Sequence, residues 1–84
     1  MAICKVAKDY LVETTTKTQS GGADFFYIAA KAGYHLASAM ITSFSGAEDI
    51  IIGVSWIGTQ YAAFTKAAPT SNKTVPVMLV WVKA

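Results

Sequence analysis

The last strand-like run of the chain, Thr74–Lys83, reads TVPVMLVWVK and decides the fold class. Its large apolar side chains alternate with a period of two, which is typical of a β-strand. One face carries Val75, Val77, Leu79 and Trp81, and the other carries Met78, Val80 and Val82. Pro76 cannot donate a hydrogen bond to a neighbouring strand, so we expect it near the start of this strand or at a sheet edge. The chain therefore ends in a strand with two apolar faces.

Further runs of strand length precede this one. They are Tyr10–Lys17, Phe25–Ala29, His35–Phe44, Ile50–Ile57 and Gln60–Lys66. Ile50–Ile57 is the run richest in β-branched residues, and Gly53 within it predicts a bulge or the close approach of another backbone. Phe25–Ala29 is apolar on both faces, which indicates a strand that is covered on both sides or that lies at a subunit contact.

Clusters of turn-forming residues, such as Ser20–Gly22 and Pro69–Asn72, separate these runs. None of the runs has a convincing helical period. Six or seven short strands without a helix predict an all-β protein, a small antiparallel β-sandwich or barrel. We expect residues 1–84 to form a single domain, because a chain of 84 residues is too short for two separate cores.

The composition predicts association between copies of the chain. Hydrophobic residues make up 54% of the sequence and charged residues only 14%, while a domain of this size buries only about 60% of its unfolded surface. The apolar surface that remains is most simply covered by further copies. The net charge of +2 comes from seven lysines without any arginine, which makes nucleic acid an unsuitable partner.

The residues that could carry chemistry are few. Cys4 and His35 are the sole cysteine and histidine, so the sequence predicts neither a disulfide framework nor a zinc site. His35 lies in an expected strand without the partners of a nucleophilic triad. Glu48 and Asp49 are interpreted as the solvated charges of an exposed turn. We therefore expect no enzyme activity, no catalytic residue, no metal and no cofactor.

The aromatic residues divide into expected core and candidate ligand contacts. Phe44, Phe64 and Trp81 share faces with other apolar residues, so we expect them in the core. Tyr34 and Tyr61 lie at the boundaries of turns, where the polar end of the ring can reach water. With Trp56, they are the candidate ligand-binding residues, on which a sugar ring could stack.

No targeting or membrane segment is expected. Charged residues interrupt the amino terminus before a signal-peptide core could form, which indicates a protein made and kept in a cytoplasm until assembly. Residues 32–47 and 50–65 lack charges, but each is shorter than the roughly 20 apolar residues of a spanning helix. A small membrane hairpin is therefore kept only as the second alternative.

Residues 32–83 resemble the carboxy-terminal knob domains of bacteriophage tail-fibre, head-fibre and receptor-binding proteins. The likeness is carried by KAGYHLASAMI after a turn, by IIIGVSWIGTQYAAF in the middle, and by the terminal TVPVMLVWVKA. The resemblance implies a β-sandwich of jelly-roll type, usually trimeric, that binds host saccharide or protein or decorates the virion. It transfers no catalytic residues.

These observations lead to one expected function and an alternative. We expect a bacteriophage virion structural protein, a trimeric fibre knob or capsid decoration, located in the virion after assembly in the host cytoplasm. Its expected partners are copies of itself, other virion proteins and a host-surface saccharide. The first alternative is a carbohydrate-binding or receptor-binding module. The final strand and the Ile50–Ile57 strand are candidates for the core or the interface of the trimer, and the candidate subunit-interface residues on them are Ile50, Ile52, Val54, Val77, Leu79 and Trp81.

Overall fold

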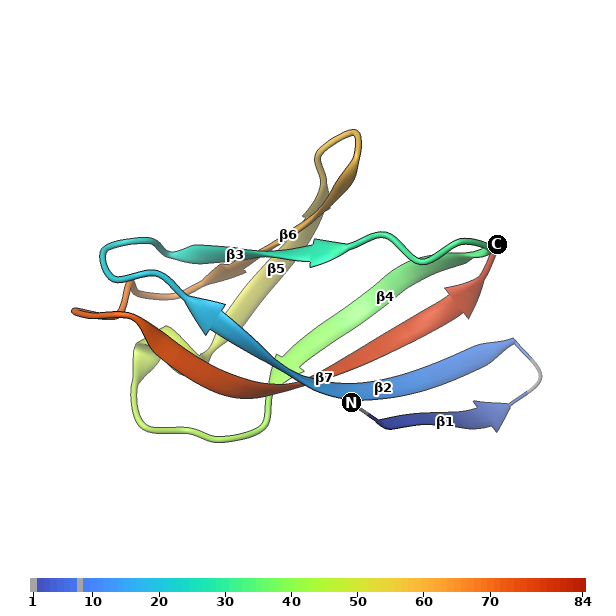
Figure 1. Cartoon of the computed structure of the whole chain (residues 1–84), viewed down its shortest axis with the longest axis horizontal. Coiled ribbons are helices and arrows are strands. Elements are labelled where there is room, and N and C mark those ends of the chain that lie inside the picture. Colours follow the sequence, from blue (N-terminus) through green and yellow to red (C-terminus); the bar gives the residue numbers. More distant parts are fainter. Residues whose placement is uncertain (1, 8) are drawn as a thin grey trace.

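The protein is all-β, with two antiparallel sheets facing each other (Figure 1). The computed structural model describes residues 2–7 and 9–84; the side chains of Ala2 and of residues 4–7, including Cys4, lie outside this description. The strands are β1 (Ala2–Ala7), β2 (Tyr10–Gln19), β3 (Phe25–Ala29), β4 (Tyr34–Ile41), β5 (Ile51–Trp56), β6 (Gln60–Thr65) and β7 (Lys73–Lys83). A single 3₁₀ turn, η1 (Ala47–Asp49), precedes β5.

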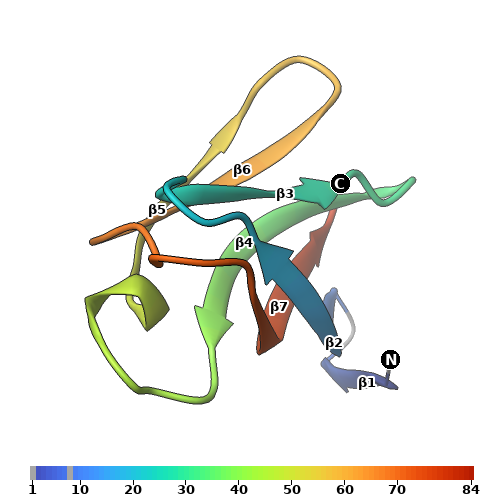
Figure 2. The same cartoon turned by 60° about the vertical axis from the view of Figure 1, so that its left-hand side comes forward.

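The strand order is β1-β2-β7-β4 in one sheet and β3-β6-β5 in the other. The chain crosses between the sheets after β2, β3, β4 and β6, while the β1–β2 and β5–β6 connections stay within one sheet. Figure 2 shows the β5–β6 hairpin projecting from the body of the molecule, with β5 along its outer margin. The predicted β-sandwich is thus confirmed, whereas its jelly-roll type and trimeric state remain predictions.

The alternation in the terminal strand produces the core. Val75, Val77, Leu79 and Trp81 are at most 2% exposed and face the second sheet. The second sheet contributes Phe26, Ile28, Tyr61 and Ala63 to the same core. Because β7 lies between β2 and β4, the longest strand sits at the centre of its sheet. Pro76 lies near the start of β7, beyond the last β4 pair, Ile41 with Val77.

The strand boundaries agree with the sequence in most places and differ at β1 and at the end of β4. β3 spans the predicted residues, and the register of β5 shifts between Ile51 and Gly53, which confirms the bulge. β1 was not predicted. β4 ends at Ile41, so Phe44 is not part of a strand and is 72% exposed; the prediction that it lies in the core is wrong. Phe64 is also exposed, at 37%, because it points out of β6.

Strands also occupy both of the charge-free segments considered for a membrane hairpin. Residues 32–47 contain β4, and residues 50–65 contain β5 and β6. Among residues 2–7 and 9–84, no helix has the length and apolar character needed to cross a membrane.

Candidate functional site

The candidate ligand-binding residues meet in one pocket at the start of β4 and the tip of the β5–β6 hairpin. Tyr34 begins β4, Trp56 ends β5, and Tyr61 is the second residue of β6. The pocket has a volume of about 620 Å³. It is lined by Ala30, Lys31, Tyr34, His35, Leu36, Trp56 and Tyr61, and is called the aromatic pocket below. The three residues selected from the sequence therefore share one site.

Two glycine turns bring the walls of the aromatic pocket together. Gly58, with φ of +99°, reverses the chain after β5, and the Ile57 N–H donates to the Gln60 carbonyl at 2.9 Å. This hairpin sets Trp56 opposite Tyr61, with their rings edge to face at a centroid distance of 4.9 Å. Gly33, with φ of +82°, forms the turn before Tyr34. Glycine is suited to both positions because it adopts positive φ without a steric cost.

Tyr61 fixes the inner wall of the aromatic pocket. Its ring is 8% exposed, and its hydroxyl oxygen accepts a hydrogen bond from the Leu36 N–H at 3.1 Å. This bond ties the three-stranded sheet to the edge strand of the other sheet. Trp56, in contrast, is 53% exposed on the outer side. The site therefore combines a rigid buried ring with an indole that faces solvent.

The charge of Lys31, which lines the aromatic pocket, is compensated by Glu13. The Lys31 ammonium is 3.7 Å from Glu13 Oε1 and lies over the Trp81 ring, 5.4 Å from its centroid. Glu13 Oε1 also accepts a hydrogen bond from the Trp81 indole N–H at 2.9 Å. Since the carboxylate of Glu13 offsets the charge of Lys31, the pocket is close to neutral. This arrangement suits stacking on an uncharged ring better than capture of an anion.

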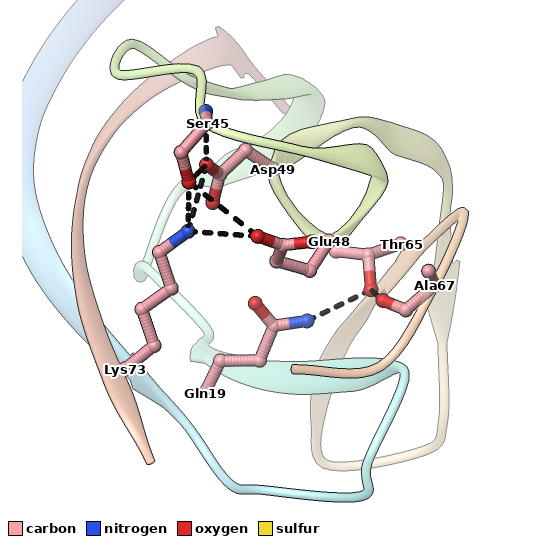
Figure 3. A network of polar contacts seen from close by, with 7 residues as sticks. All are labelled: Gln19, Ser45, Glu48, Asp49, Thr65, Ala67 and Lys73. Carbon is pink, nitrogen blue, oxygen red and sulfur yellow. Dashed lines mark hydrogen bonds and ion pairs between the residues drawn. The ribbon is translucent and has the colours of Figure 1, made fainter. Parts of the chain in front are cut away.

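A second polar cluster lies at the opposite end of β7 and was not expected from the sequence. The Lys73 ammonium donates to Ser45 Oγ, Asp49 Oδ2 and Glu48 Oε1 at 2.5, 2.9 and 3.1 Å (Figure 3). Asp49 Oδ2 also accepts from the Ser45 N–H at 2.7 Å and the Ser45 hydroxyl at 2.8 Å. These four residues are called the Lys73 network below.

The interpretation of Glu48 and Asp49 as an exposed turn is wrong for Asp49, which is 5% exposed. Burial disfavours its charged form, but hydrogen bonds from Lys73 and Ser45 outweigh this effect and lower the pKa of the Asp49 carboxyl. The pKa of Glu48 is lowered mainly by a backbone hydrogen bond and next by the hydrogen bond from Lys73. The hydrogen bond to Asp49 in turn raises the pKa of Lys73. The carboxylates thus hold the lysine in its charged form.

This charge state decides what the Lys73 network can do chemically. A serine hydroxyl beside a lysine resembles a nucleophile with its base, but a base must be unprotonated to accept the hydroxyl proton. Lys73 stays protonated and donates a hydrogen bond to Ser45 Oγ, while the Ser45 hydroxyl donates one to Asp49 Oδ2. The network is therefore suited to fastening η1 onto the start of β7, and its geometry does not activate Ser45.

The candidate subunit-interface residues fall into two groups. Ile50 and Ile52 are 38% and 66% exposed, and Val54 is partly buried at the edge of the core. Val77, Leu79 and Trp81 are 1–2% exposed inside the sandwich. Because the opposite sheet already covers these three side chains, they have no surface to offer a second copy. Of the two places expected for the final strand, these three side chains therefore occupy the core, and Ile50, Ile52 and Val54 stay interface candidates.

Comparisons with other proteins do not assign the site. Searches against family models, curated proteins and solved structures found no match to this chain. Among the residues whose side chains the structure describes, no three His, Cys, Asp or Glu are grouped so that they could hold a metal ion. The function is therefore argued from the geometry of the aromatic pocket and of the exposed surface.

Proposed function

We propose that this chain is a structural protein of a bacteriophage virion, a fibre knob or capsid decoration that assembles from several copies of itself. The observation that carries the proposal is the outer face of the three-stranded sheet. The residues that point outward from β3, β5 and β6 include no charged side chain. They are Phe25, Tyr27, Ala29, Gly53, Ser55, Gln60, Ala62 and Phe64.

Aromatic residues form a continuous surface on this outer face. The ring of Phe25 lies 5.4 Å from that of Tyr27 and 6.1 Å from that of Phe64, between centroids. Beside them is a hollow of about 190 Å³, lined by the same three rings together with Ile57 and Ala62. Tyr27, on the outward face of β3, is 49% exposed. Exposed apolar surface of this kind is typical of a protein–protein contact.

The sequence left two explanations for the two apolar faces of Phe25–Ala29: cover on both sides, or a subunit contact. Phe26 and Ile28 are buried in the core, whereas Tyr27 on the other face is 49% exposed. This favours the subunit contact. The resemblance of residues 32–83 to phage knob domains supports the virion as the place of assembly and supports three as the number of copies.

Two experiments test this proposal. Mass spectrometry of purified particles of the virus that encodes the chain is expected to find it in a fixed ratio to the major capsid or tail protein, and immunogold labelling is expected to place it on the capsid or the fibre. A chain that is abundant in infected cells but absent from purified particles would contradict the virion role. Neighbouring genes for capsid or tail proteins would distinguish the two locations.

A second candidate function is the binding of carbohydrate in the aromatic pocket. It is favoured by the exposed indole of Trp56 next to the hydroxyl of Tyr61 and the nearly neutral Lys31–Glu13 pair. Aromatic rings with nearby polar groups are typical of sites that position a small ligand. On a glycan array, Trp56→Ala is expected to lose the signal, while Phe44→Ala, which removes an exposed ring outside the pocket, keeps it. Tyr61 is a poor first choice for mutation because it also supports the core.

A further inference from the structure

Strand β5 is a free edge of the three-stranded sheet. In the described part of the chain it pairs with β6 on one side and with no strand on the other. Figure 2 shows β5 along the outer margin of the projecting hairpin, where another strand could approach it. The unpaired N–H and C=O groups of an edge strand are a template for pairing with a further strand.

The register identifies the outward-pointing main-chain groups of β5. The Ile57 N–H donates to the Gln60 carbonyl, so this pair is hydrogen-bonded. Opposed residues of antiparallel strands alternate between hydrogen-bonded and non-hydrogen-bonded pairs. Counting back from Ile57, the main-chain groups of Ser55 therefore point toward β6, and those of Trp56 and Val54 point away from it. Two donors and two acceptors are left on the open edge.

The β5 edge has few of the features that prevent the edge strands of monomeric proteins from pairing with another chain. Residues 51–56 include no charge and no proline, and Ile52 and Trp56 are 66% and 53% exposed. Natural edge strands are usually protected by lysine, proline, a bulge or a covering segment. β5 has one bulge, between Ile51 and Gly53, and it ends before Val54. The stretch from Val54 to Trp56 is regular and open.

We infer that two copies of this chain join through antiparallel pairing of their β5 strands about a two-fold axis at Ser55. Val54 of each copy then lies opposite Trp56 of the other, and their outward groups form four main-chain hydrogen bonds. The two three-stranded sheets become one six-stranded sheet. This inference rests on the self-assembly in the proposed function and identifies the β5 edge as a contact in addition to the aromatic outer face.

A second copy is the occupant that this edge fits best, because a two-fold contact must be self-complementary. A charged residue near the axis would face its own copy, and this segment has none; the residue on the axis, Ser55, is small and exposed. A hollow of about 270 Å³ lies beside the edge, lined by residues 36–39 and 51–54, several of which are small. The exposed indole of Trp56 from the second copy lies next to Val54, where it can fill this hollow.

The two-fold pairing gives an assembly with an even number of chains. It produces a dimer, or links three-fold units into a hexamer where a three-fold contact also forms. It also places Trp56 inside the contact, so a saccharide and a second copy would compete for this side chain. Both consequences can be measured.

Sedimentation equilibrium of the wild-type chain, Ser55→Lys and Thr16→Lys tests the inference. Ser55→Lys places two ammonium groups face to face at the axis, whereas Thr16→Lys adds the same charge at an exposed position of β2, away from the contact. We expect an even number of chains for the wild type and for Thr16→Lys. For Ser55→Lys we expect the dissociation constant to rise roughly tenfold or more. Circular dichroism checks that both variants keep the wild-type fold.

Tryptophan fluorescence is the second readout, because Trp81 is buried in any assembly state and only Trp56 is exposed. Iodide is expected to quench Trp56 in dilute solution and in Ser55→Lys, but not in concentrated wild-type protein. A wild-type monomer or trimer at high micromolar concentration would overturn the inference, as would an even-numbered assembly whose mass does not respond to Ser55→Lys. The virion role is tested separately, by the presence of the chain in particles.

Discussion

The two tryptophans of this protein lie on either side of Tyr61 but in opposite surroundings. Trp81 is 6.0 Å from the Tyr61 ring, 1% exposed, and donates its indole N–H to Glu13. Trp56 is 4.9 Å from the same ring and 53% exposed, and its indole N–H has no acceptor among the described residues. The sandwich therefore provides cover and a hydrogen bond for one indole and neither for the other. This difference identifies the β5 edge as a surface for a partner.

The largest effect is expected from truncating the two indoles separately. Trp81→Ala leaves a cavity between the sheets and is expected to lower the free energy of unfolding by about 3–5 kcal/mol. Trp56→Ala, measured in dilute solution, is expected to cost less than about 1 kcal/mol because the side chain is half exposed. Urea denaturation followed by circular dichroism measures both. Equal losses would show that Trp56 is part of the core.

The Lys73 network is expected to give the next effect. Lys73→Met leaves the buried carboxylate of Asp49 without its cation, so the variant is expected to unfold at lower urea than the wild type. Arg at this position keeps a cation near both carboxylates, so Lys73→Arg is the matched control and should lose less. A Lys73→Met variant as stable as the wild type would contradict the fastening role of the network.

The same network predicts a pH dependence. The folded-state pKa values of Asp49 and Glu48 are lowered from their ordinary 3.8 and 4.5, so the stability they contribute is present above those values and is lost as the pH falls through the lowered pKa. The pKa of Lys73 is raised above 10.5, so its contribution is present below that pH and is lost as the pH rises through the raised pKa. Thermal unfolding is expected to respond more weakly to acid in Lys73→Met than in the wild type.

The strands were predictable because their signal is local. The alternation of Val75, Val77, Leu79 and Trp81 along one strand requires no knowledge of the rest of the chain, and each of the four is buried. The gathering of Tyr34, Trp56 and Tyr61 was only partly predictable, since the turns placed two of them at strand ends but could not show that these ends meet. The core assignment of Phe44 failed because β4 ends earlier than its pattern indicated.

The Lys73 network could not be predicted from spacing alone. Lys73 is separated from Asp49 by 24 positions and from Ser45 by 28, and nothing in either segment identifies the other as its partner. In the sequence, Ser45, Glu48 and Asp49 have the composition of an ordinary solvated turn. The approach of Asp49 to Lys73, the first residue of β7, depends on the folded path of the chain.

A smaller effect is expected at Glu13, which accepts the hydrogen bond of the buried Trp81 indole. Glu13→Gln keeps an acceptor for the Trp81 N–H but removes the charge beside Lys31, so we expect a loss of about 1 kcal/mol or less. Glu13→Leu removes the acceptor as well and leaves a buried N–H unpaired, which is expected to cost about 1–3 kcal/mol. Urea midpoints distinguish the two variants. A larger loss for Gln than for Leu would contradict the role assigned to this carboxylate.

Amide hydrogen exchange along β5 tests the central claim most directly. The N–H groups of Val54 and Trp56 are expected to exchange rapidly in dilute solution and at least about tenfold more slowly when the protein is concentrated, as expected when a free edge becomes paired. The Ser55 N–H, which faces β6 at either concentration, is expected to change much less. If Val54 and Trp56 exchange at the same rate at both concentrations, β5 is not the surface through which the copies assemble.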